Sequence, residues 1–294
     1  MEKAVYHLPG LFEFYDFYRK FLPIYREKTE YFYDWCQIGS LYGAPADCLW
    51  AGGRVSTGNA NPRQVLALTE EYDLSARLTF SNSLLRPEHL KDPKCNRLCA
   101  LFGAEPGNGV IVHSELLLDY LKEKYPNFYF VSSTTKVLTD FEDLAAETER
   151  PDFRYVVPDF RLNKAFDRLA GLKEKRKVEF LCNECCWPGC RERKACYENV
   201  SRKNLGEHCP DHICAAPEGE KGYRFSAAMK NPAFIGIRDI RETYLPMGFS
   251  QFKIEGRGLG SAMLLEFILY YLTKPEYQLP LREEMYLDSM LDLF

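Results

Sequence analysis

The sequence KVEFLCNECCWPGCRERKACYENVSRKNLGEHCPDHIC, residues 177–214, joins a short apolar segment to a cysteine-rich loop. Seven of the eleven cysteines of the chain lie in this stretch, at Cys182, Cys185, Cys186, Cys190, Cys196, Cys209 and Cys214. Free thiols often fill protein cores, but the Asn, Glu, Arg and Lys residues between these cysteines are too polar for a core. Disulfides are typical of secreted chains, and residues 1–8 do not resemble an export signal. The pattern therefore favours thiolates that bind a metal ion or an iron–sulfur cluster.

Two cysteine pairs in this loop contain turn residues that allow their thiols to converge. A Pro-Gly pair bends the chain in Cys186-x3-Cys190, and a proline directly follows the first cysteine of Cys209-x4-Cys214. We predict that these four thiolates bind a 4Fe–4S cluster, with Cys196 as a substitute ligand. Zinc is the alternative, because it also accepts four thiolates. Zinc sites usually contain Cys-x2-Cys pairs, however, and this stretch has only one.

Eight short apolar segments with strand character alternate with segments of helical periodicity. The predicted strands cover residues 3–8, 48–51, 76–81, 109–113, 128–132, 153–157, 178–181 and 251–254. This alternation implies a parallel sheet covered by helices. Eight repeats favour a closed (β/α)8 barrel of the TIM type, for which about 250 residues is typical. A doubly wound open sheet is the alternative, but no Gly-rich dinucleotide motif follows the first strand.

The barrel prediction also gives the domain organisation. We expect one α/β barrel domain over residues 1–273, with the cysteine-rich loop 182–214 inserted after strand seven. The tail, residues 274–294, should pack on the outside of the barrel. Because barrel proteins carry their sites at the C-terminal ends of the strands, the loop should lie at that face. Polar residues that follow predicted strands should line the same opening, namely Asn82, Asp159, Asn183 and Glu184.

A second group of functional candidates follows the eighth predicted strand, in FKIEGRG, residues 252–258. Lys253, Glu255 and Arg257 alternate with apolar residues, so all three should face the barrel interior. Buried charges need partners, and the group is therefore either a structural ion network or a substrate site. Loops after the last strands of such barrels often hold an anion. The Arg257 guanidinium is suited to bidentate binding of a carboxylate or phosphate.

The segment FKIEGR resembles a hallmark of the collagenase-like peptidase family U-32. The resemblance includes the preceding segment, residues 239–247, and the phrase MGFSQ, and it extends from about Gly109 onward. The order of the VEF strand, the cysteine-rich loop and KIEGR matches the family, whereas the cysteine spacing departs from it. The resemblance implies a TIM-type barrel with a 4Fe–4S cluster at its mouth. Several relatives take part in hydroxylation of RNA bases or of the ubiquinone ring, some depending on prephenate, and Arg257 would then anchor the carboxylate of such a donor.

We therefore expect a redox enzyme that hydroxylates or otherwise modifies RNA or a small metabolite. Lys253, Glu255 and Arg257, with Asn183 and Glu184, are the predicted substrate-binding residues; the catalytic residues are unassigned. A protein partner for electron transfer or heterodimer formation is a further expectation.

Two alternatives belong to other functional classes. A peptidase would need a recognisable nucleophile and base, for which His113, Ser114 and Asp159 are the candidates. The sequence has no G-x-S-x-G or H-E-x-x-H motif. A non-enzymatic interaction protein stabilised by zinc is the other alternative. The net charge of −4 and the lack of a run of about 18 apolar residues indicate no strongly basic nucleic-acid surface and no membrane span, and we expect a cytoplasmic location.

Overall fold

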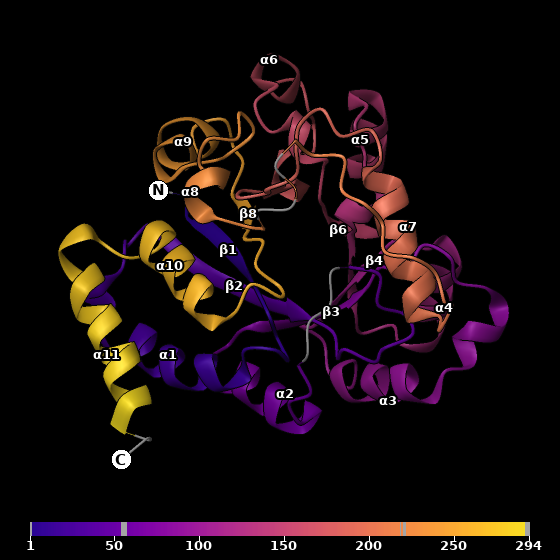
Figure 1. The fold of residues 1–294 in the computed structure, drawn as a ribbon, viewed down its shortest axis with the longest axis horizontal. Helices are drawn as coiled ribbons and strands as arrows, with labels where there is room; N and C mark the ends of the chain where they lie inside the picture. Colours follow the sequence, from indigo (N-terminus) through magenta and orange to yellow (C-terminus); the bar gives the residue numbers. More distant parts are fainter. Residues whose placement is uncertain (1, 54–57, 218, 220–221, 292–294) are drawn as a thin grey trace.

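Eight parallel strands form the centre of the structure, and helices surround them (Figure 1). The computed structural model describes residues 2–53, 58–217, 219 and 222–291. The strands are β1 (Ala4–Pro9), β2 (Cys36–Gly43), β3 (Ser75–Phe80), β4 (Gly109–Val112), β5 (Tyr129–Ser132), β6 (Phe153–Val156), β7 (Glu179–Leu181) and β8 (Gln251–Lys253). Their order is β6-β5-β4-β3-β2-β1-β8-β7, and a parallel bridge between Val156 and Val178 links its two ends. The predicted (β/α)8 barrel is thus confirmed, in a nearly closed form.

The helices lie in the connections between strands, and side-chain caps fix where several of them begin. They are α1 (Tyr15–Glu27), α2 (Pro62–Glu71), α3 (Pro93–Phe102), α4 (Glu115–Lys124), α5 (Phe141–Glu149), α6 (Phe166–Leu169), α7 (Arg193–Asn204), α8 (Phe225–Ala228), α9 (Ile237–Asp239), α10 (Ser261–Tyr271) and α11 (Gln278–Leu291). The Asn61 side chain accepts a hydrogen bond from the Arg63 N–H at the start of α2. Ser114 caps α4 as predicted, accepting from the Leu117 N–H. In the part of the chain that the structure describes, no helix is long and apolar enough to cross a membrane.

The second strand differs from the prediction. Residues 48–51 form a buried turn, and the strand is β2, Cys36–Gly43, which pairs with β1. The apolar run at 48–51 reflects packing, because Trp50 is fully buried and lies edge-on to Phe80 at 5.3 Å between ring centroids. Gly52 follows the turn where the chain passes so close to β3 that a Cβ would lie 2.2 Å from the Ser81 carbonyl oxygen. Tertiary packing therefore places this loop beside the end of β3.

The barrel interior contains a small apolar layer. Its residues come from five strands or strand ends and pack on one another apart from the main core: Tyr42, Ile111, Val131, Val157 and Leu181. A polar layer lies toward the N-terminal ends of the strands. Arg77 stands two residues before the pocket residue Thr79 on β3, and Glu179 stands two residues before Leu181 of the apolar layer on β7. The Arg77 Nη1 donates to Glu179 Oε2 at 2.5 Å, and both side chains are almost completely buried. This layer closes the barrel below its C-terminal mouth.

The cysteine-rich insertion, residues 182–235, lies over the C-terminal end of the barrel. Its longest helix, α7, is fixed to the end of β3, because the Asn82 side chain donates to the Ser201 carbonyl at 3.1 Å. The insertion begins at Cys182, whose N–H donates to the Lys253 carbonyl on β8. On the opposite flank α11 lies beside α10 (Figure 1). Nearby, the Tyr31 and Tyr277 rings stack with 4.7 Å between their centroids. The insertion is therefore the part of the chain that covers the mouth.

Candidate active site at the barrel mouth

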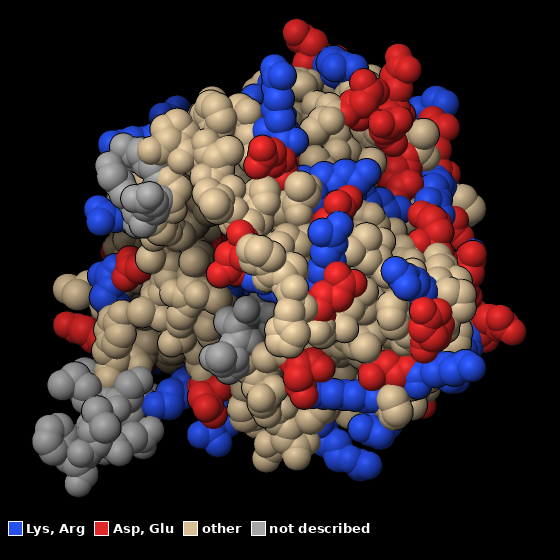
Figure 2. Space-filling model, turned by 45° about the vertical axis from the view of Figure 1, so that its right-hand side comes forward, with Lys and Arg blue, Asp and Glu red and all other residues tan. Residues whose placement is uncertain are grey.

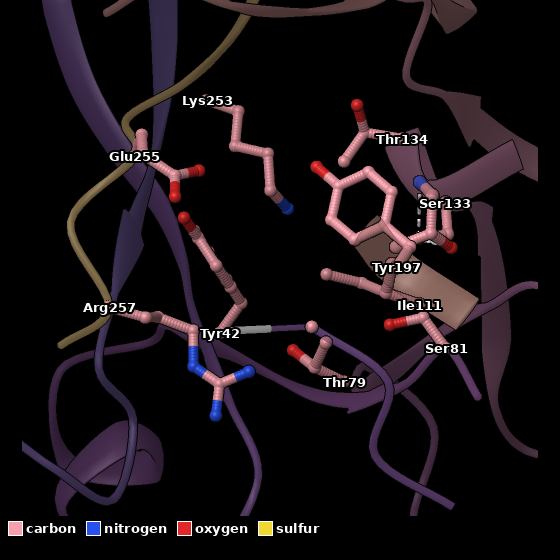
Figure 3. Close-up of a pocket in the computed structure, with 12 residues that line it drawn as sticks. Tyr42, Thr79, Ser81, Ile111, Ser133, Thr134, Tyr197, Lys253, Glu255 and Arg257 are labelled. Atoms are coloured by element: carbon pink, nitrogen blue, oxygen red, sulfur yellow. Dashed lines mark hydrogen bonds between the residues drawn. The ribbon is translucent and has the colours of Figure 1, made fainter. Parts of the chain in front are cut away.

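A pocket with an empty volume of about 500 Å³, including its open mouth, lies at the C-terminal ends of the strands (Figure 3). Its walls come from β2, β3, β4, β8 and the residues after them, from the β5–α5 loop and from α7. The lining residues are Tyr42, Gly53, Thr79, Ser81, Ile111, Ser133, Thr134, Thr135, Tyr197, Lys253, Glu255 and Arg257. The pocket thus contains the whole Lys253–Glu255–Arg257 group that the sequence predicts for one site.

Arg257 is held rigidly with one nitrogen left over. Its Nε donates to Glu13 Oε1 at 2.8 Å, and its Nη2 donates to the Ala44 carbonyl at 3.1 Å. The Nη1 atom is buried and has no hydrogen-bond partner among the described residues. A buried guanidinium nitrogen without a partner is costly, so the arrangement suits an anionic ligand that supplies the missing acceptor.

Lys253 brings a second cation to the pocket. Its Nζ lies 3.7 Å from the centroid of the Tyr42 ring and 3.3 Å from Glu179 Oε1. Burial and the nearby Arg77 charge together lower the pKa of the Lys253 amine to about 8, against the opposing effect of the Glu179 carboxylate. Part of this lysine is therefore neutral at mildly alkaline pH.

Three hydroxyl groups in the pocket wall are also unsatisfied. Thr79 Oγ1, Ser81 Oγ and Thr134 Oγ1 are buried and have no hydrogen-bond partner within the described structure. Buried polar atoms in proteins are normally paired, so such groups on one wall indicate a place where a ligand or water is expected. Thr79 and Ser81 stand two residues apart at the end of β3 and therefore point to the same side. These hydroxyls face the same space as the two cations (Figure 3).

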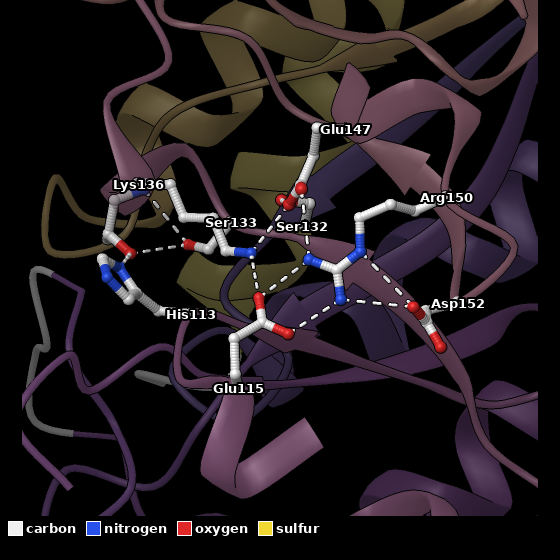
Figure 4. A network of polar contacts seen from close by, with 9 residues as sticks. His113, Glu115, Ser132, Ser133, Lys136, Glu147, Arg150 and Asp152 are labelled. Atoms are coloured by element: carbon white, nitrogen blue, oxygen red, sulfur yellow. Dashed lines mark hydrogen bonds and ion pairs between the residues drawn. The ribbon is translucent and has the colours of Figure 1, made fainter. Parts of the chain in front are cut away.

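A polar network behind the β5–α5 loop fixes the wall that carries Thr134 (Figure 4). Lys136 forms ion pairs with Glu115 and Glu147, and Arg150 pairs with the same two carboxylates. Ser132, at the end of β5, donates to Glu147 Oε1 at 2.6 Å. These contacts join β5, α4 and α5, and they hold the loop in place from the side away from the pocket.

His113 and the hydroxyls of this loop form a short chain of contacts. The His113 Nδ1 lies 2.8 Å from Thr135 Oγ1, which donates to Ser133 Oγ at 3.0 Å. Burial lowers the pKa of His113 to about 4, with the Lys136 charge adding to the effect. His113 is thus neutral at physiological pH. The Asp159 carboxylate pairs with Arg161 and Arg193, and these contacts engage it away from His113.

Two predicted substrate residues hold the barrel ends and the insertion together. The Asn183 side chain accepts from the Glu255 N–H at 2.7 Å and donates to the Glu255 carbonyl, which joins the ends of β7 and β8. Glu184 accepts from the N–H groups of Cys185 and Cys186 and pairs with Arg193 at 2.6 Å. Neither is among the lining residues of the pocket in the described chain. The Asn183 side chain instead positions Glu255, which does line the pocket, and Glu184 fixes the start of the insertion.

The predicted metal ligands lie along the insertion at the rim of the mouth. Cys214 is exposed, whereas Cys186, Cys190, Cys196 and Cys209 are partly buried. Within residues 2–53, 58–217, 219 and 222–291, no three or more His, Cys, Asp or Glu side chains are grouped so that they could hold a metal ion. In this arrangement the thiols do not fit a 4Fe–4S cluster or a four-thiolate zinc site. The iron–sulfur cluster therefore stays a prediction.

Several pocket residues did not follow from the sequence. Tyr42 lies on the strand that was misplaced, and Tyr197 comes from helix α7 of the insertion. Glu13 meets Arg257 across a separation of 244 residues, which no local pattern indicates. For the unpaired hydroxyls of the pocket, the sequence offered a signal in Thr79 and Ser81, which alternate with apolar residues at the end of the third predicted strand.

Comparison with known proteins gives a structural relationship only. No family model matches the sequence, and neither does any curated protein. Among solved structures, the U32 peptidase Mk0906 is similar, with a TM-score of 0.54 and 14% sequence identity over 86% of this chain and 92% of that one. At this identity the similarity shows the fold alone. The chain therefore has a U32-like TIM-type barrel, the fold that the resemblance of its FKIEGR segment implied.

Proposed function

We propose that this chain is an enzyme whose active site is the mouth pocket, and that it binds a small molecule carrying a carboxylate or a similar anionic group. The observation that carries the proposal is Arg257 Nη1, which is buried at the pocket and has no partner in the described parts of the chain, while the other two guanidinium nitrogens are fixed by Glu13 and Ala44. An anion would supply the acceptor that this nitrogen lacks. The hydroxyls of Thr79, Ser81 and Thr134 would then bind the neutral polar part of the same molecule.

The charge distribution of the molecular surface favours a small ligand over a polyanion. Figure 2 shows acidic and basic side chains interspersed on the face drawn, and the net charge is −4. A polyanion such as RNA is usually bound by an extended basic surface. Of the two predicted substrate classes, we therefore propose a metabolite rather than RNA.

For the reaction class, we propose an oxidative modification such as hydroxylation. The support is the position of the insertion: Cys196 precedes Tyr197, and Tyr197 lines the pocket from α7. Helix α7 of the thiol-rich insertion thus contributes Tyr197 to the pocket, although no thiol is among the lining residues of the described chain. The resemblance of FKIEGR to the U-32 family agrees with this class.

Peptidase chemistry finds less support. A Ser–His–carboxylate arrangement joins Ser40, His7 and Glu179, with 2.8 Å from His7 Nδ1 to Ser40 Oγ and 3.5 Å from His7 Nε2 to Glu179 Oε2. All three side chains are sealed inside the barrel, with exposed fractions of 0–1%. A peptide cannot reach a nucleophile in this position. We interpret the group as a structural network.

Ligand binding can test the proposal directly. Acetate, succinate, benzoate and inorganic phosphate would be titrated against the full chain and followed by protein-observed NMR. A charge-assisted hydrogen bond contributes about 1.5–3 kcal/mol, so Arg257→Gln should weaken carboxylate binding by roughly 10- to 100-fold. Arg238→Gln, whose side chain is 86% exposed, is the matched control and should bind like the parent.

The variant could lose binding through misfolding, because Glu13 would keep a buried charge. The double variant Glu13→Gln, Arg257→Gln removes both charges and separates the two effects. Unchanged carboxylate affinity in a folded Arg257 variant would contradict the proposal, as would failure of every anion to bind at millimolar concentration.

A further inference from the structure

Lys253 has the surroundings of a reactive amine. Its side chain is 6% exposed and its ammonium group lies against the Tyr42 ring, at the inner end of the mouth pocket (Figure 3). The charged and titratable groups that face it are Glu179 on β7, Arg77 on β3, His7 on β1 and Glu255 beyond β8. The Arg77 cation, the Glu179 carboxylate and the neutral His7 imidazole thus face the amine from the barrel interior.

The negative charge of the Glu179 carboxylate is already balanced by Arg77, so Lys253 is not needed as its ion-pair partner. The Glu179 Oε2 atom is 2.5 Å from Arg77 Nη1, whereas the Lys253 Nζ is 3.3 Å from the other carboxylate oxygen. Burial alone would raise the pKa of the Glu179 carboxyl, yet Arg77, His7 and Lys253 together keep it below its ordinary value. The stronger ion pair is thus made by arginine. Lys253 remains the group at the pocket, where its nitrogen can meet a ligand.

We propose that Lys253 is a nucleophilic lysine that forms an imine with the carbonyl carbon of a small oxo acid whose carboxylate binds Arg257. The inference rests on the proposed function, since it needs the anion position at Arg257. Both side chains line one pocket and come from the same strand end, four residues apart. A molecule that carries a carbonyl beside a carboxylate would satisfy both at once.

The covalent step balances without any oxidant or reductant. The neutral amine nitrogen adds to the carbonyl carbon and gives a carbinolamine, as one proton passes from the nitrogen to the former carbonyl oxygen. Loss of that hydroxyl group with the second proton of the nitrogen as water forms the C=N bond. Hydroxyls at Thr79 and Ser81 are donors for the departing oxygen, and both lack a partner in the described structure.

The amine must be neutral for this addition, and the pocket favours that form. Burial and the Arg77 charge lower the pKa of Lys253 to about 8 against the opposing effect of Glu179. The neutral fraction therefore rises steeply between pH 7 and 9, whereas an exposed lysine has an ordinary pKa of about 10.4. Imine formation on Lys253 should follow the same rise.

Borohydride trapping is the test. The full chain would be incubated with pyruvate, 2-oxoglutarate or levulinate and then with sodium cyanoborohydride, whose hydride reduces the C=N bond to a stable secondary amine. Peptide mapping by mass spectrometry should place one adduct on Lys253, with a yield that rises through pH 8. Lys253→Arg and the uncharged Lys253→Met should lose this adduct. Lys164→Arg, at an ion-paired lysine outside the pocket lining, should keep it.

The outcomes separate the two proposals. An oxo acid that binds in the NMR titration but gives no Lys253 adduct would overturn the imine and leave the proposed function intact. Adducts spread evenly over surface lysines, or undiminished in folded Lys253→Met, would also overturn it. Failure of every carboxylate to bind would refute both. A tenfold or greater loss of trapping in the double variant Glu13→Gln, Arg257→Gln would support the shared site.

Discussion

Thr79 and Thr69 are both buried threonines, but only one of them has a partner for its hydroxyl. Thr69 Oγ1 donates to the Leu66 carbonyl at 2.9 Å, whereas Thr79 Oγ1 has no hydrogen-bond partner among the described residues. Replacing a buried unpaired hydroxyl by a methyl group of the same shape is neutral or stabilising. The pair therefore separates a residue that serves the fold from one that serves the pocket.

We expect Thr79→Val to keep or raise the free energy of unfolding, by up to about 1 kcal/mol, and to weaken ligand binding. Thr69→Val should lower it by about 1 kcal/mol, because the Leu66 carbonyl loses its donor. Urea denaturation of both variants measures the difference. If Thr79→Val were destabilised as much as Thr69→Val, the Thr79 hydroxyl would have a structural partner and would not be reserved for a ligand.

At the residue scale, the sequence predicted which charged side chains share the pocket, but it did not predict which residues they pair with. Alternation on one strand was enough to bring Lys253, Glu255 and Arg257 to one side, and the structure gathers them in one pocket. What each charge does depends on distant residues. Glu13 fixes Arg257, and Glu179 faces Lys253, across 244 and 74 residues of sequence. Such pairings are set by strand order, which local patterns do not contain.

At the scale of the elements, metal binding by the cysteine-rich insertion stays a prediction. Its first residues are fixed by Glu184 and its helix α7 by Asn82. Its thiols remain spread along the rim, and no described group of three donors forms. Binding of one metal centre by Cys186, Cys190, Cys209 and Cys214 would require this loop to rearrange. Metal binding should therefore change how readily a protease cleaves this loop.

We expect protein purified without oxygen to contain about four irons and a similar amount of sulfide per chain. Alanine variants at Cys186, Cys190, Cys209 and Cys214 should lose iron. Cys99→Ala, at a buried thiol in α3, is the control and should keep it. Chelation of the iron should increase protease cleavage between residues 182 and 235. One zinc per chain without iron would favour the structural alternative, and neither metal would contradict the metal site.

The elements themselves were largely predictable, with one instructive exception. Seven of the predicted strands overlap β1 and β3–β8, because each is an apolar run between turn residues. The sequence of β2, CQIGSLYG, contains two glycines and two polar residues and has low strand propensity. Pairing with β1 and β3 on both sides overrides that propensity. The neighbouring run at 48–51 was mistaken for the strand because burial in a loop gives the same apolar signal.

For the whole molecule, the polar layer inside the barrel makes stability depend on acidity. Burial, with the Arg77 charge, lowers the pKa of His7 from 6.5 to about 3, so His7 is neutral in the folded chain. An unfolded chain binds a proton at His7 below pH 6.5, and stability is lost between pH 6.5 and 3. The Glu179 carboxyl has a lowered pKa and adds a further loss below its ordinary value of 4.5.

We expect the free energy of unfolding to be about 2 kcal/mol lower at pH 5 than above pH 7 through His7 alone, and to fall more steeply below pH 4.5. Urea denaturation across this pH range measures the slope. His7→Gln should reduce the loss between pH 6.5 and 5, whereas His208→Gln, at an exposed position, should not change it. An equally steep loss in folded His7→Gln would show that other groups cause the acid sensitivity.

The nearly closed barrel has one line along which its strands are joined differently. Between β6 and β7 the described chain has a single bridge, Val156 to Val178, whereas every other neighbouring pair forms a ladder. Mechanically, such a barrel is a split ring, and a split ring widens at its gap with the least strain. The diameter of the mouth can therefore change along this one line while the seven ladders stay intact. Asp159 and Glu184, which follow the two strands at the gap, both pair with Arg193, so this arginine sets how far the mouth can widen.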